Sequence, residues 1–159
     1  MSVILDLKNL HEIDDFLWLE ETIKILKAKQ FTALDLDNLI EELEDLGSER
    51  RHQVESMLEQ VIRHLLLLQY WTAERNYNEG HWRSEIAVFR NQLKRKLTTN
   101  LKNHLAGQLD KLYQDALESV QEKTLSSVAF PSECPYTLEQ ILTPKWLPEY
   151  QYQSAVICT

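Results

Sequence analysis

The sequence predicts an all-α fold: an antiparallel bundle of four to five main helices, closed by a short proline-rich C-terminal wrap. The first reason is that 159 residues include only 3 Gly and 4 Pro, and a chain so poor in turn formers favours long helices over many short strands. The second is that apolar residues recur every three or four positions over most of the chain. Because 43% of the residues are apolar, one core can form, and we expect a single helical domain over residues 1–159.

Two amphipathic helices are predicted in the N-terminal third. The first covers residues 12–30, where the helical spacing is kept by Phe16, Leu19, Ile23 and Leu26. The second begins after Asp35, whose carboxylate suits an N-cap, and ends at Gly47, which suits a helix stop. Its apolar positions are expected to face the core: Leu36, Leu39, Ile40 and Leu43.

Three further helices are predicted in the middle of the chain. The third keeps an apolar stripe for four turns: Val54, Met57, Leu58, Val61, Ile62, Leu65 and Leu68. "NYNEGH", residues 76–81, is predicted as a loop before a fourth helix over residues 82–97. "TTN", residues 98–100, separates it from a fifth helix over residues 101–120. After residue 124 come all four prolines, with a capping box formed by Thr137 and Gln140 before a short helix.

Charge and composition restrict the classes of function. A formal net charge of −8 argues against a protein whose main task is binding bulk nucleic acid, since phosphates repel an acidic surface. Two cysteines make no disulfide framework, and "HLLLLQYW", residues 64–71, is too short to cross a bilayer. We therefore expect a cytoplasmic protein without a membrane partner.

The stretch "NLIEELEDLGSERR", residues 38–51, concentrates carboxylates on one predicted helix. Glu44 and Asp45 each lie about one turn from Glu41, and these carboxylates could share a divalent cation if His64 of the next helix joined them. Glu44, one turn after Ile40, is expected to reach inward toward His64 or Arg83. The sequence contains a single E-x-x-H, formed by Glu49 and His52, and no H-E-x-x-H, so no cofactor is predicted, and a solvated acidic face is the alternative.

A basic and aromatic face is predicted on the fourth helix. It comprises Trp82, Arg83, Arg90 and Lys94. Such a face could bind phosphates or an acidic protein, or it could balance the acidic helix within the same molecule. No glycine-rich phosphate loop or RNA-recognition signature accompanies it.

Four stretches occur in the order seen in a bacterial family abundant in cyanobacteria. They are "FTALDLDNLIEELEDLGSERR", "HLLLLQYWTAER", "HWRSEIAVFRNQL" and "FPSECPYTLEQIL". Through them the chain resembles domain of unknown function 29 over roughly residues 14–150. The resemblance implies an all-helical protein, and because the family has no settled biochemical role it transfers no catalytic residue.

Three functions remain open on the sequence alone. The leading hypothesis is a small non-catalytic interaction or regulatory module that binds a protein partner or a second copy of itself. The alternative is a metal-dependent hydrolase or nuclease built on the acidic block and His64. The third is nucleic-acid binding through the local basic face.

Overall fold

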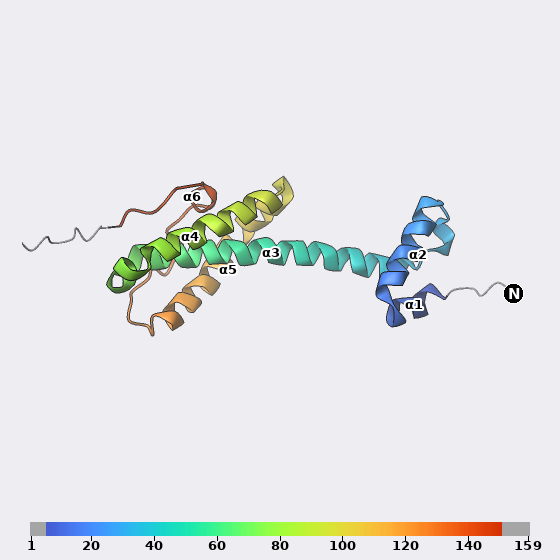
Figure 1. The fold of residues 1–159 in the computed structure, drawn as a ribbon, viewed down its shortest axis with the longest axis horizontal. Coiled ribbons are helices and arrows are strands. Elements are labelled where there is room, and N and C mark those ends of the chain that lie inside the picture. The colour runs from blue at the N-terminus through green and yellow to red at the C-terminus, as the bar shows by residue number, and fades with distance from the viewer. Residues whose placement is uncertain (1–5, 151–159) are drawn as a thin grey trace, which may run out of the picture. The chain divides into compact units, whose positions relative to one another are not determined.

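The computed structural model describes residues 6–150, and these form helices and loops without a strand (Figure 1). The prediction of an all-α fold is therefore confirmed. The chain divides into two compact units, Met1–Arg50 and Arg51–Thr159. One helix runs through this division, so the expectation of a single domain stays a prediction. None of the helices in the described range combines the length and the apolarity that crossing a bilayer requires.

The first unit contains α1 (Leu7–Ile13), α2 (Asp15–Lys27), the 3-10 turn η1 (Phe31–Ala33) and the beginning of α3 (Leu36–Tyr70). The helix predicted over residues 12–30 corresponds to α2, and a short additional helix, α1, precedes it, with Asp14 between the two. The Asp14 carboxylate accepts a hydrogen bond from the backbone N–H of Leu17 at 3.0 Å and caps α2. The Asp6 carboxylate caps α1 in the same way.

The predicted helix stop at Gly47 is wrong, because α3 continues without interruption from Leu36 to Tyr70. A glycine inside a helix costs about 1 kcal/mol relative to alanine, which does not stop a helix whose neighbours favour it. Good helix formers lie within three residues of Gly47 on either side, namely Glu44 and Leu46 before it and Glu49 and Arg50 after it. The second and third predicted helices are therefore one.

The loop predicted over residues 76–81 is also wrong, because α4 extends from Thr72 to Lys96. The turn between α3 and α4 takes a single residue, Trp71. It is held by Arg75, whose Nε donates to the carbonyl of Leu68 and whose Nη2 donates to that of Gln69, both at 2.8 Å. These bonds occupy carbonyls at the end of α3 that have no partner within the helix. The hydrogen bonds of this buried arginine thereby stabilise a one-residue turn, where the sequence predicts a longer loop.

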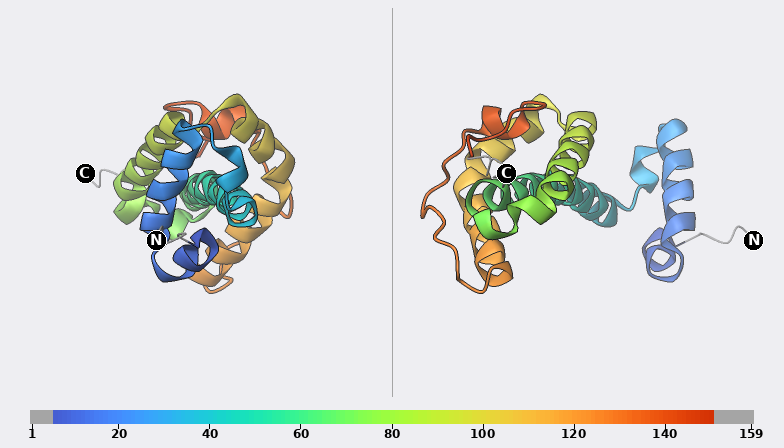
Figure 2. Two further views of the ribbon diagram at one scale, coloured as in Figure 1. Left: turned by 90° about the vertical axis from the view of Figure 1, so that its right-hand side faces the viewer. Right: turned by 60° about the vertical axis from the view of Figure 1, so that its left-hand side comes forward.

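The second unit contains the core, formed where α4 and α5 (Thr99–Lys123) lie alongside the second half of α3 (Figures 1 and 2). The joint predicted at residues 98–100 is confirmed, with Thr98 capping α5 through a bond from the N–H of Leu101. The central residues of the predicted stripe are all completely buried: Leu58, Val61, Ile62 and Leu65. The three long helices pack against each other, as predicted for a bundle.

The C-terminal segment runs over the second unit and carries α6 (Leu138–Leu142). The predicted capping box is present, since the Thr137 and Gln140 side chains each accept from the other residue's backbone N–H. Tyr136 is buried in the core, and its hydroxyl donates to Gln69 of α3 at 2.7 Å. The proline-rich wrap predicted from the sequence is therefore attached to the bundle by both apolar and polar contacts.

Candidate functional site

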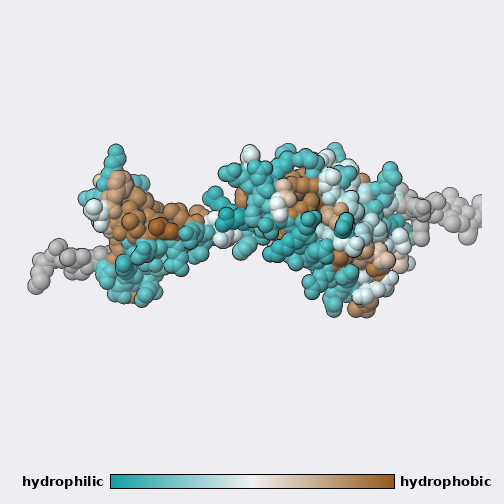
Figure 3. All heavy atoms as spheres, turned by 180° about the vertical axis from the view of Figure 1, so that it is seen from behind, coloured by the Kyte–Doolittle hydropathy of each residue, from teal (hydrophilic) through white to brown (hydrophobic). Residues whose placement is uncertain are grey.

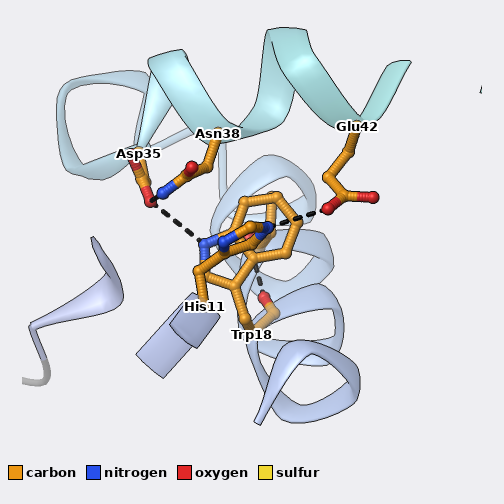
Figure 4. A network of polar contacts seen from close by, with 6 residues as sticks. His11, Trp18, Asp35, Asn38 and Glu42 are labelled. Atoms are coloured by element: carbon orange, nitrogen blue, oxygen red, sulfur yellow. Dashed lines mark hydrogen bonds and ion pairs between the residues drawn. The ribbon is translucent and has the colours of Figure 1, made fainter. Parts of the chain in front are cut away.

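A polar network holds the helices of the first unit together (Figure 4). Trp18 of α2 is buried, and its indole Nε1 donates to Asp35 Oδ2 at 3.2 Å. The amide of Asn38 donates to the same oxygen at 2.6 Å. His11 of α1 packs edge-on against Trp18, with ring centroids 4.8 Å apart, and its Nε2 donates to Glu42 of α3 at 2.8 Å. One indole and one imidazole therefore connect α1 and α2 to the first turns of α3.

The electrostatics of this network follow from its charges. The hydrogen bond to the Glu42 carboxylate raises the pKa of His11 above its ordinary value, because the carboxylate favours the protonated imidazole. Asp35 is buried, and its second oxygen, Oδ1, has no hydrogen-bond partner in the structure. The network is therefore a structural contact that leaves one carboxylate oxygen unsatisfied.

This packing turns a polar side of α3 toward α1 and α2 and leaves the apolar side outward. The predicted core positions Leu36, Ile40 and Leu43 are between 52% and 59% exposed, so the prediction that they face a core is wrong. Leu39 is only half-buried. The physical reason is that Asp35, Asn38 and Glu42 occupy the side of α3 that the neighbouring helices cover.

The apolar stripe of α2 is exposed as well. We define the first-unit apolar surface as seven side chains of α2 and α3, each between 39% and 67% exposed: Phe16, Leu19, Ile23, Leu26, Leu36, Ile40 and Leu43. Figure 3 shows a continuous apolar area over the first unit. The residues that sequence periodicity assigns to a core form a surface instead.

The acidic block does not assemble the predicted cation site. Glu41, Glu44 and Asp45 are all exposed, so the expectation that Glu44 reaches inward is wrong. Glu42 is exposed as well, and it is the member of this acidic block that contacts another helix, through His11 of α1. Within residues 6–150, no three His, Cys, Asp or Glu side chains converge in a way that could hold a metal ion.

His64 has a structural partner on its own helix. Its Nδ1 donates to the carbonyl of Gln60 at 2.6 Å, and its ring stacks on Phe89 of α4 with centroids 6.2 Å apart. Burial lowers the pKa of His64 below its ordinary value, since the charged imidazolium would lose its hydration. At neutral pH the ring is therefore uncharged and completes the packing between α3 and α4.

The predicted basic and aromatic face separates into buried and exposed residues. Trp82 is buried and stacks on Trp71 with centroids 5.9 Å apart. Arg90 is also buried, while Arg83 and Lys94 are exposed. Arg83 pairs with Glu79 one turn earlier at 3.5 Å. The four residues therefore do not form one open face.

Arg90 binds the protein's own backbone. Its guanidinium donates to the carbonyls of Ile141 at 2.7 Å, Trp146 at 2.7 Å and Gln140 at 3.2 Å. Burial lowers the pKa of Arg90 to about 10, which keeps the group charged at neutral pH. Arg90 is thus the clamp that holds the C-terminal segment on α4.

A shallow groove of about 320 Å³ lies beside this clamp. Its lining combines three basic and three apolar residues: Arg83, Arg90, Lys145, Ile86, Ala87 and Leu147. The Arg90 guanidinium is occupied by carbonyls and Arg83 is paired with Glu79. Lys145 is therefore the basic residue that the groove adds to those of the predicted basic face.

Sequence reasoning missed residues whose polar contacts hold helices together in both units. Trp18 lies five positions before Ile23, on the other side of α2 from the apolar stripe, and a tryptophan off the stripe indicates a second buried side. His11 and Arg75 carried no recognisable signal, because their partners are distant in sequence or are backbone carbonyls.

Residues 10–147 match the family model described as Domain of unknown function DUF29. The chain belongs to this family. No curated protein and no solved structure matches it. For this DUF29 chain the family assignment confirms the resemblance read from the four sequence stretches, and it adds no activity. The first-unit apolar surface is therefore the feature of the DUF29 chain from which a function can be argued.

Proposed function

We propose that the DUF29 chain is a non-catalytic interaction module that binds protein through the first-unit apolar surface. The exposure of two amphipathic helix stripes in one unit carries this proposal. The seven side chains together expose on the order of 700 Å², whereas the largest apolar patch on a typical monomer is about 300–600 Å². Exposing this much apolar area to water is unfavourable in free energy. Contact with another apolar surface removes that unfavourable contribution.

The charges at the α3 edge of this surface favour protein over nucleic acid or anionic lipid. Glu44 lies one turn after Ile40, at the edge of the α3 stripe, and Glu41 and Asp45 follow on the neighbouring side of the helix. Carboxylates in this position are repelled by nucleic-acid phosphates and by anionic lipid headgroups. An apolar surface with an acidic edge is suited to the apolar face of another helix.

The residues considered for catalysis support the same proposal. His64 and Arg90 have intramolecular partners that explain their burial. Glu44 is exposed, and it lies in a different unit from His64. The hypothesis of a metal-dependent hydrolase or nuclease is therefore not supported by any group of converging metal-ligand side chains in the described part of the chain.

Site-specific photo-crosslinking tests the proposal. Phe16, 67% exposed on α2, is replaced by the photoreactive analogue p-benzoylphenylalanine, and the chain is irradiated in the cells that express it. Tyr77, 86% exposed on α4, takes the same replacement as the matched control. We expect a discrete protein adduct from position 16 and none from position 77. Absence of any adduct from position 16, at an expression level where the chain itself is detected, would overturn the proposal.

A further inference from the structure

We infer that the protein bound by the first-unit apolar surface is a second copy of this chain, an inference that rests on the proposed function. The surface comes from two helices, α2 and α3, with α2 held against the start of α3 by the Trp18–Asp35 hydrogen bond. Two exposed apolar stripes in one unit need a partner surface of the same kind to cover them. Pairing with an identical unit about a two-fold axis supplies such a surface.

The exposed apolar area is close to the area that a standard interface buries on each partner. A standard protein interface buries about 800 Å² on each partner, and the seven apolar side chains alone offer on the order of 700 Å² per copy. The polar groups around them add to this area when the copies meet. Two-fold pairing covers both surfaces in one step, whereas an unrelated partner would need its own matching surface.

Charge complementarity selects how the helices pair. Lys27 lies one turn after Ile23, at the edge of the α2 stripe, just as Glu44 lies one turn after Ile40 at the edge of the α3 stripe. Placing α3 against α3 of the other copy would bring acidic blocks together, which is unfavourable. Placing α2 of each copy on α3 of the other brings Lys27 beside the acidic edge that includes Glu44. The dimer we infer therefore exchanges α2–α3 contacts between copies.

The first experiment measures the molar mass of the purified full-length chain by light scattering during size-exclusion chromatography, over a hundredfold range of concentration. We expect a dimer that Ile40→Asp converts to a monomer. Val88→Asp, at a residue 45% exposed on α4, is the matched control and should remain a dimer. Circular dichroism shows whether the Ile40→Asp chain keeps its helices, and charge reversals at the surface provide a second, milder set of variants.

The charge reversals test the pairing itself. Glu44→Lys and Lys27→Glu should each raise the dimer dissociation constant by about tenfold, and the double variant should restore most of the loss. A dimer unaffected by Ile40→Asp, or single reversals with no effect, would overturn the inference.

The two proposals fail in different ways. A wild-type monomer that is nevertheless crosslinked to a different protein at position 16 would refute the second copy and leave the interaction module standing. A wild-type monomer with no adduct at position 16 would refute both.

Discussion

Replacing Arg90 by methionine should detach the C-terminal segment from the bundle. Arg90 is 6% exposed, and its guanidinium donates to three backbone carbonyls in or just after α6. Methionine keeps much of the side-chain volume but removes every donor. Hydrogen bonds from a charged group contribute about 1.5–3 kcal/mol each, and a buried acceptor left without a partner costs about 1–3 kcal/mol.

The expected loss of unfolding free energy is about 3–5 kcal/mol, less than the sum of three such bonds. The sum is not reached because the segment can open, which lets water reach the freed carbonyls. Opening also exposes Ile141, which is completely buried in the folded protein. The loss is therefore limited by the free energy that holds the segment in place.

Urea unfolding followed by circular dichroism gives the magnitude, and hydrogen exchange of the amides in residues 138–147 shows where the loss is localised. Lys94→Met, at an exposed residue one turn further along α4, is the matched control and should change stability by less than about 0.5 kcal/mol. A loss below about 1 kcal/mol for Arg90→Met, with unchanged exchange in α6, would refute the clamp.

Three further predictions concern the core, the first unit and the acidic block. Leu65→Ala should cost about 2–5 kcal/mol in chemical unfolding, because Leu65 is completely buried; a cost below about 1 kcal/mol would contradict the packing of α3. The raised pKa of His11 means that its contribution to stability is full below the unfolded value of 6.5 and is lost as pH rises through the folded value. Amide hydrogen exchange in α2 should therefore accelerate with pH by more than the intrinsic chemical exchange rate does, and His11→Gln should remove this extra increase. An identical pH profile in both chains would refute the prediction. Glu44→Gln and Glu41→Gln should leave the thermal unfolding midpoint unchanged with or without Mn²⁺, since both side chains are exposed; a midpoint raised by metal and lowered again by Glu44→Gln would instead support the metal enzyme.

The candidate site was less predictable than the helices, and Arg90 illustrates why. The spacing of Arg90 from Arg83 and Lys94 correctly indicates that the three residues lie on one side of a helix. Periodicity describes only how residues are arranged around one helix, and it does not say which neighbouring segment covers them. The C-terminal carbonyls that bind Arg90 lie about 50 residues away in the chain.

Several properties are determined by the sequence itself, because they depend on residues close together in the chain. The helical content, the joint at residues 98–100 and the capping box of Thr137 and Gln140 follow from local spacing and from local hydrogen bonds. The buried stripe of α3 around Leu58 and Leu65 is also predictable, since it is apolar over four turns without interruption.

Only the tertiary structure decided which apolar stripes are covered. Residues 36–43 and residues 54–65 have the same helical period on the same helix, yet Ile40 is exposed and Leu58 is completely buried. Around Leu58, α4 and α5 supply apolar partners, whereas near Ile40 the indole of Trp18 and the imidazole of His11 bind the polar side of α3. An amphipathic pattern states that a helix has an apolar side, and the partner that buries this side comes from elsewhere in the chain or from another molecule.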